Sequence, residues 1–139
     1  MTPAEARRRF GAARVARLAT ADRAARPHLV PLVFAADGDT VVSVVDHKAK
    51  RTTALRRLAN VAVNPSVTLL VDHYSDDWEQ LWWVRADGRA AVLDAGSACA
   101  ERAVDLLVAR YAPYRRRRPT GPVLAVTVQR WSGWSASGD

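Results

Sequence analysis

Short apolar segments with the composition of β-strands recur along the 139-residue chain, and turn residues separate them. Asp37-Gly38 stands between two of these segments and predicts a hairpin, and Asp87-Gly88 predicts a further turn. Six to seven strands with two or three short helices predict a mainly β protein of the α+β type. The expected architecture is an antiparallel barrel, closed or partly closed. The expected strands occupy residues 14–22, 27–39, 40–45, 67–74, 81–88, 89–93 and 123–134.

Helical spacing is clearest over residues 97–111, where Ser97 is the expected cap and Pro113 follows the end. A shorter helix is expected at the start of the chain, because Thr2, Pro3 and Glu5 suit its first turn. The chain has neither an internal repeat nor a low-complexity segment. One domain spanning residues 1–139 is therefore expected, large enough to bury a sizeable core.

The composition restricts the classes of function. The net charge is +7, which favours an anionic partner, although 19 of the 21 cations are arginine and part of the excess reflects compositional bias. The lone Cys99 excludes an internal disulfide, and the three histidines lack ligand spacing, so no metal site is expected. Residues 1–25 lack the apolar core of a signal peptide, and no apolar run is long enough to cross a membrane. A soluble cytoplasmic protein is the expectation.

The stretch VVDHKAKRTTALRRL, residues 44–58, crowds cations directly after a valine-rich strand. A brief helix is expected over 52–59, with Leu55 and Leu58 packed inward and Arg56 and Arg57 turned toward solvent. Backbone N–H groups at a helix start attract anions, and cations before that start reinforce the effect. The residues expected to bind a phosphate are Lys48, Lys50, Arg51 and Thr52. A solvated basic surface beside a packed helix is the alternative.

Two other features bear on the ligand. The aromatic residues Tyr74, Trp78, Trp82 and Trp83 lie among acidic neighbours, which repel nucleic-acid backbones, so nucleic-acid binding is not expected. Successive side chains of a strand alternate between its faces, so Trp82 and Trp83 face opposite sides. One tryptophan fills the core, and the other lies at an interface or forms a wall for a planar ring.

Catalytic motifs are absent from the sequence. No nucleophile elbow, phosphate-binding loop or Gly-rich dinucleotide fingerprint is present, and His28 is expected to be structural. The segment Arg115 to Arg118 is expected to be a solvated loop, with a flexible polyanion as its alternative partner. No residue is assigned a catalytic role. If the protein is an enzyme, a bound cofactor carries the chemistry.

The order of parts resembles the pyridoxamine 5'-phosphate oxidase-like split β-barrel superfamily. The resemblance spans a helix, RVARLAT, RPHLVPLVF, DGDTVVSVV, KAKRTTALRRLANVAVNPSVTLLVD and WEQLWWVRADGRA. It is closest to the branch of small oxidoreductases that use the deazaflavin coenzyme F420, and the FMN-binding branch shares the layout. The resemblance implies a homodimer with cofactor sites between the subunits.

The resemblance also implies which residues contact the cofactor. The basic stretch from Lys48 to Thr52 would hold its phosphate. The residues expected along the tricyclic ring are Val30, Pro31, Val44 and Val45 of one subunit, with Trp82, Trp83 and Arg85 of the other. Some relatives carry a polar residue at the position of Val30, so here backbone groups are expected to bond the ring.

Three functions follow from the resemblance. The first is an F420-dependent oxidoreductase that passes a hydride to a small electron-poor acceptor. The second is an FMN-dependent oxidase or flavin reductase, and the third is a protein that binds a cofactor without turnover.

Overall fold

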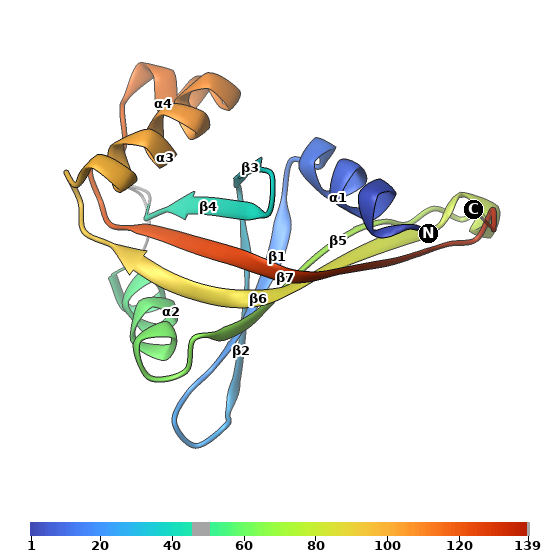
Figure 1. Ribbon diagram of the computed structural model, residues 1–139, viewed down its shortest axis with the longest axis horizontal. Coiled ribbons are helices and arrows are strands. Elements are labelled where there is room, and N and C mark those ends of the chain that lie inside the picture. The colour runs from blue at the N-terminus through green and yellow to red at the C-terminus, as the bar shows by residue number, and fades with distance from the viewer. Residues whose placement is uncertain (46–50, 139) are drawn as a thin grey trace.

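The structure is a computed structural model that describes residues 1–45 and 51–138, with residues 51–55 described by their backbone alone. Helices and strands of this part of the chain are drawn in Figure 1. In chain order they are α1 (Pro3–Ala12), β1 (Ala16–Ala21), β2 (Pro27–Leu32), β3 (Ala35–Asp37), β4 (Thr40–Val44), α2 (Arg51–Val63), β5 (Ser66–His73), the 3-10 helix η1 (Trp78–Gln80), β6 (Trp82–Leu93), α3 (Ala98–Arg110), α4 (Ala112–Arg116) and β7 (Val123–Ser135). None of the described helices is long and apolar enough to cross a membrane.

The strands of this part of the chain form one antiparallel sheet in the order β2-β1-β5-β6-β7-β4-β3. β2 and β3 lie at opposite edges of the sheet, although only Val33 and Phe34 separate them in sequence. The sheet must therefore curl until its two edges meet. The predicted mainly β fold, an antiparallel split barrel with short helices, is confirmed.

Two apolar clusters hold this architecture. The larger cluster fills the barrel and includes Phe10 and Phe34, whose rings lie 4.8 Å apart. The smaller cluster lies between α3 and the strands β3, β4 and β7, and Leu107 is fully buried in it. β4 separates the two, because Val41 belongs to the first cluster and Val42 to the second. β4 is therefore buried on both faces.

Phe34 is the joint at which the barrel closes. Its backbone groups bond to side chains from the end of α3 in place of a neighbouring strand. The Tyr111 hydroxyl donates to the Phe34 carbonyl oxygen at 2.7 Å and accepts from the Phe34 N–H at 3.2 Å. Arg110 also donates to that carbonyl oxygen, at 3.0 Å. The same arginine donates to the carbonyl oxygen of Ala13, so α3 ties the joint to the turn before β1.

Several predicted boundaries are wrong. Residues 27–39 form two strands, because the chain bends at Phe34 to reach the other edge of the sheet. Asp87-Gly88 is a bulge inside the continuous strand β6, not a turn. The helix expected over 52–59 runs to Val63, beyond Asn60, because the Asn60 side chain donates to Thr20 and docks that turn on β1. The start of the expected loop after residue 111 is helical, as α4.

The bulge generates a prediction about stability. A Cβ atom at Gly88 would lie 2.2 Å from the backbone oxygen of Thr127, and no side-chain rotation relieves a clash with backbone. We expect Gly88→Ala to lower the free energy of unfolding by about 1–3 kcal/mol through overpacking. Urea unfolding followed by circular dichroism measures the change.

Gly11 provides the control, since it lies in α1 and a Cβ atom there meets nothing within 4 Å. Gly11→Ala should raise the free energy of unfolding by up to about 1 kcal/mol, because alanine is the better helix former. Equal stability of the two variants would contradict the assignment of a tight strand contact to Gly88.

Candidate functional site

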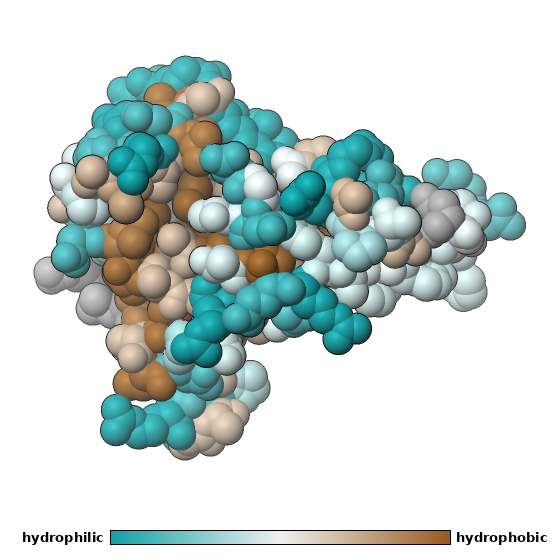
Figure 2. Space-filling view, in the orientation of Figure 1, coloured by the Kyte–Doolittle hydropathy of each residue, from teal (hydrophilic) through white to brown (hydrophobic). Residues whose placement is uncertain are grey.

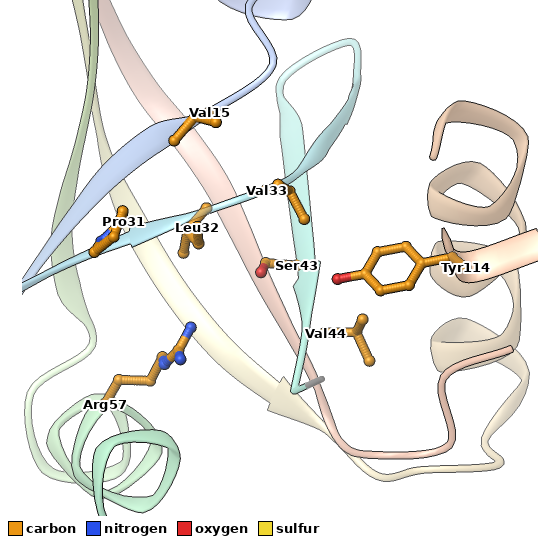
Figure 3. A pocket seen from close by; sticks show the side chains of 8 residues that line it. All are labelled: Val15, Pro31, Leu32, Val33, Ser43, Val44, Arg57 and Tyr114. Atoms are coloured by element: carbon orange, nitrogen blue, oxygen red, sulfur yellow. The ribbon is translucent and has the colours of Figure 1, made fainter. Parts of the chain in front are cut away.

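A cavity of about 360 Å³ opens between β2, β4, α2 and α4 (Figure 3). Most of its lining is aliphatic, and three polar side chains from three different elements project into it. Apolar walls with a few convergent polar groups are the usual composition of a small-molecule site. The lining residues are Val15, Pro31, Leu32, Val33, Ser43, Val44, Arg57 and Tyr114.

Arg57 supplies the positive charge of this cavity. Its guanidinium group points into the cavity from α2 (Figure 3), and its Nε atom is buried without a hydrogen-bond partner among the described residues. Burial lowers the pKa of Arg57, Tyr114 opposes that shift, and within the described part of the chain no carboxylate offsets the burial. A half-buried cation without an acidic partner attracts an anion. The expectation that Arg57 faces solvent is therefore wrong, whereas Arg56 beside it is exposed.

Ser43 contributes a hydroxyl from the middle of β4. The residue is only 6% exposed, and its oxygen points into the cavity (Figure 3). On an alternating strand, Ser43 faces the same side as Val41, which belongs to the larger core cluster. A polar side chain thus occupies an inward position within a run of valines.

Tyr114 contributes a second hydroxyl from α4, on the opposite side of the cavity from Arg57 in Figure 3. The residue is 7% exposed, and its ring meets that of Tyr111 edge to face, with 5.9 Å between ring centroids. Because Tyr111 is held by the joint at Phe34, the position of Tyr114 depends on the same bonds that close the barrel.

The start of α2 was expected to bind phosphate. Lys48 and Lys50 lie outside the described residues, and Arg51 and Thr52 open the helix, described by backbone alone. Arg57 follows six residues after Arg51, which is about 9 Å along a helix axis. The helix start and the guanidinium group can therefore contact different parts of one ligand. The phosphate assignment to the first turn stays a prediction.

The expected ring contacts divide between two places. Pro31 and Val44 line the cavity, and Val45 follows immediately at the end of β4. Val30 is not among the lining residues, and its side chain is buried in the larger core cluster. Whether Pro31, Val44 and Val45 touch a ring stays a prediction.

Trp82, Trp83 and Arg85 line a separate cavity of about 380 Å³, at the end of the β5-β6-β7 ribbon far from α3. The Arg85 guanidinium lies 5.5 Å from the centre of the Trp83 ring, and His73 stacks on Trp82 at 6.4 Å. This cavity shares no lining residue with the first. Within one chain these residues therefore do not meet Arg57, and their expected contact with a second subunit's cofactor stays a prediction.

The arginines at 115–118 are not simply a solvated loop. Arg115 donates to the carbonyl oxygens of Val108 and Ala109, at the C-terminal end of α3. Arg118 contacts the carboxylates of Glu101 and Asp105, at 2.6 and 2.9 Å. All four of these arginines are exposed, and two of them thus contact α3. A polyanion as the partner of this segment stays a prediction. No group of acidic, histidine and cysteine residues that could hold a metal occurs among the described residues.

Comparison with known proteins places the chain among characterised folds. A family model described as pyridoxamine 5'-phosphate oxidase matches residues 2–135. No curated protein matches. Among solved structures, a FAD-binding protein from Mesorhizobium loti is 19% identical, with 96% of this chain and 94% of that chain covered and a TM-score of 0.72.

Two further structures show what else this fold accommodates. The haem storage protein HutZ from Vibrio cholerae is 16% identical, covers 95% of this chain and 90% of its own, and has a TM-score of 0.70. A FAD-binding protein from Mycobacterium smegmatis is also 16% identical, with 96% of both chains covered and a TM-score of 0.64. At these identities the likeness establishes the fold.

The joint that positions Tyr114 can be tested by removing one oxygen atom. Tyr111→Phe leaves the buried N–H of Phe34 without an acceptor, so we expect the free energy of unfolding to fall by about 1–3 kcal/mol. Urea unfolding measures it. Tyr74→Phe is the control, because Tyr74 is 70% exposed and the same change there should cost less than about 0.5 kcal/mol. If the Tyr111→Phe protein were as stable as the control, the hydrogen bonds between Tyr111 and Phe34 would not hold the barrel closed.

Proposed function

Because the chain belongs to the pyridoxamine 5'-phosphate oxidase family, we propose that it is an oxidoreductase that binds coenzyme F420 in the cavity beside Arg57. The observation that carries the proposal is the partly buried Arg57, aimed into an apolar cavity and without an acidic partner among the described residues. A phosphorylated planar cofactor supplies both the missing anion and a ring for the aliphatic walls.

The choice of F420 over FMN rests on charge. The chain carries 21 cations against 14 acidic residues, and F420 bears a phosphate and a tail of glutamates. Electrostatic attraction therefore favours the more anionic cofactor. FMN is the second candidate, supported by FAD-binding proteins among the structures of this fold. A carrier without turnover is the third candidate, supported by the haem storage protein of the same fold.

In this proposal the chain's own residues bind, orient and shield. When bound, the reduced cofactor supplies a hydride for a small electron-poor acceptor, and solvent supplies the proton. Pro31, Leu32 and Val44 hold the ring flat and exclude water from its faces. Arg57 and the start of α2 fix the anionic part and so set the ring's position.

The proposal includes a homodimer, since the cavity of a single chain lacks a wall on one side. Strand register places Pro31, Arg17, Leu70 and Arg85 in one row across β2, β1, β5 and β6, so the sheet face runs from the first cavity to the second. Apolar side chains are exposed beside this row, with Leu29 at 67%. On another face, Figure 2 shows an apolar band that runs from α3 past the ends of β6 and β7 toward α2. A second copy on the sheet face would bring its Trp83 and Arg85 to the ring.

Titration with F420 and FMN side by side tests the cofactor assignment. We expect F420 fluorescence to be quenched with micromolar saturation, and flavin absorbance to change less at equal concentration. Arg57→Gln should weaken binding of the preferred cofactor about 10–100-fold, as expected for a lost charge-assisted bond.

Arg56→Gln is the matched control, since Arg56 is exposed on the same helix, and its affinity should stay near that of the unchanged protein. Lys50→Ala combined with Arg51→Ala tests the helix start separately and should cost about 2–4 kcal/mol of binding. If Arg57→Gln binds as tightly as Arg56→Gln, the cavity is not the anion site.

Light scattering tests the dimer, and we expect twice the chain mass of 15.2 kDa. Leu70→Lys should shift the protein toward monomer, because it adds a charge between Arg17 and Arg85 on the proposed contact face. Leu106→Lys is the control, since Leu106 on α3 is 38% exposed and Leu70 36%. A stable monomer that still binds the cofactor would contradict the shared site.

A further inference from the structure

We propose that Ser43 and Tyr114 determine which ring this cavity accepts, by hydrogen bonding to a ring edge that presents both carbonyl and N–H groups. This inference rests on the proposed function and deepens it. Flavins and deazaflavins share a pyrimidine-dione edge with two carbonyl acceptors and one N–H donor. A tetrapyrrole presents alkyl groups along most of its edge and carboxylates at one side. The two hydroxyls would therefore select the first class of ring over the second.

The position of Ser43 supports a polar contact. Its hydroxyl lies in an otherwise aliphatic wall, 6% exposed, and points into the cavity (Figure 3). A hydroxyl in such a wall gains stability when a ligand in the cavity is hydrogen-bonded to it. A valine would fill the same inward position of β4 at no polar cost, as Val41 does two residues earlier.

The rigidity of Tyr114 supports a directional contact. Its ring is buried against Tyr111, so its hydroxyl is aimed by packing. In Figure 3 the hydroxyl extends toward the side of the cavity where Ser43 lies. Each hydroxyl can both donate and accept, which suits an edge where donors and acceptors alternate. A site that recognised charge alone would have cations at these two positions.

The remaining lining residues favour the same class of ligand. Haem iron is held in proteins by histidine, cysteine, methionine or tyrosine. Among the described residues that line this cavity, Tyr114 is the one side chain of that set. The effect of removing its hydroxyl therefore differs between the two classes of ligand: a flavin-type ring loses one hydrogen bond, whereas haem loses its only lining ligand.

The experiment measures dissociation constants for four probes: FMN, its N3-methylated analogue, F420 and hemin. The proteins are the unchanged chain, Ser43→Ala, Tyr114→Phe, the double variant and a Ser66→Ala control, since Ser66 is exposed on β5. We expect each single variant to bind FMN and F420 about threefold to tenfold more weakly, the cost of one hydrogen bond. The control should match the unchanged chain. Thermal unfolding of each variant verifies that it is folded.

The methylated probe isolates the ring edge. The unchanged chain should prefer FMN to N3-methyl-FMN, and the double variant should lose that preference. If the unchanged chain binds F420 and the double variant binds it equally well, the inference is wrong and the proposed function stands. If the unchanged chain binds hemin but neither FMN nor F420, and Tyr114→Phe abolishes hemin binding, both are wrong.

Discussion

The fold depends on one bend, because β2 and β3 are neighbours in sequence and lie at opposite edges of the same sheet. Phe34 at that bend is fully buried, so its backbone groups need partners that no strand provides. Tyr111 and Arg110 provide them from the end of α3. A helix that looks peripheral in the ribbon thus completes the hydrogen bonding of the barrel.

The same bend assembles the candidate site. It brings β2 beside β4, so Pro31 and Ser43 face one cavity, and the bonds to Tyr111 set α4 and Tyr114 beside them. On the other side, the buried bond from Asn60 to Thr20 docks α2 on β1 and turns Arg57 inward. The hydrogen bonds that close the barrel therefore also position the cavity walls. A substitution that loosens the bend at Phe34 should displace both β2 and α4.

The sequence predicts the approximate positions of most strands and the hairpin at Asp37-Gly38, since alternation and turn chemistry are local. It predicts a turn at Asp87-Gly88 where the structure has a bulge. The same residue pair occurs in turns and in bulges, and pairing with β7 determines which of the two forms. Arg56 and Arg57 are about 100° apart on a helix, so one of them faces inward, but which one depends on how α2 docks. Ser43 stands out in its valine run, although nothing local shows that a cavity lies before it.

The bonds at Phe34 also order the events of synthesis. Their partners lie 76 and 77 residues further along the chain, and β7 must emerge later still to pair with both β6 and β4. The first hundred residues therefore leave the ribosome with β1 able to pair with β2 and β5 but without the groups that close the barrel. Until residue 111 arrives, the nascent sheet has unpaired edges, the surfaces that chaperones protect from aggregation.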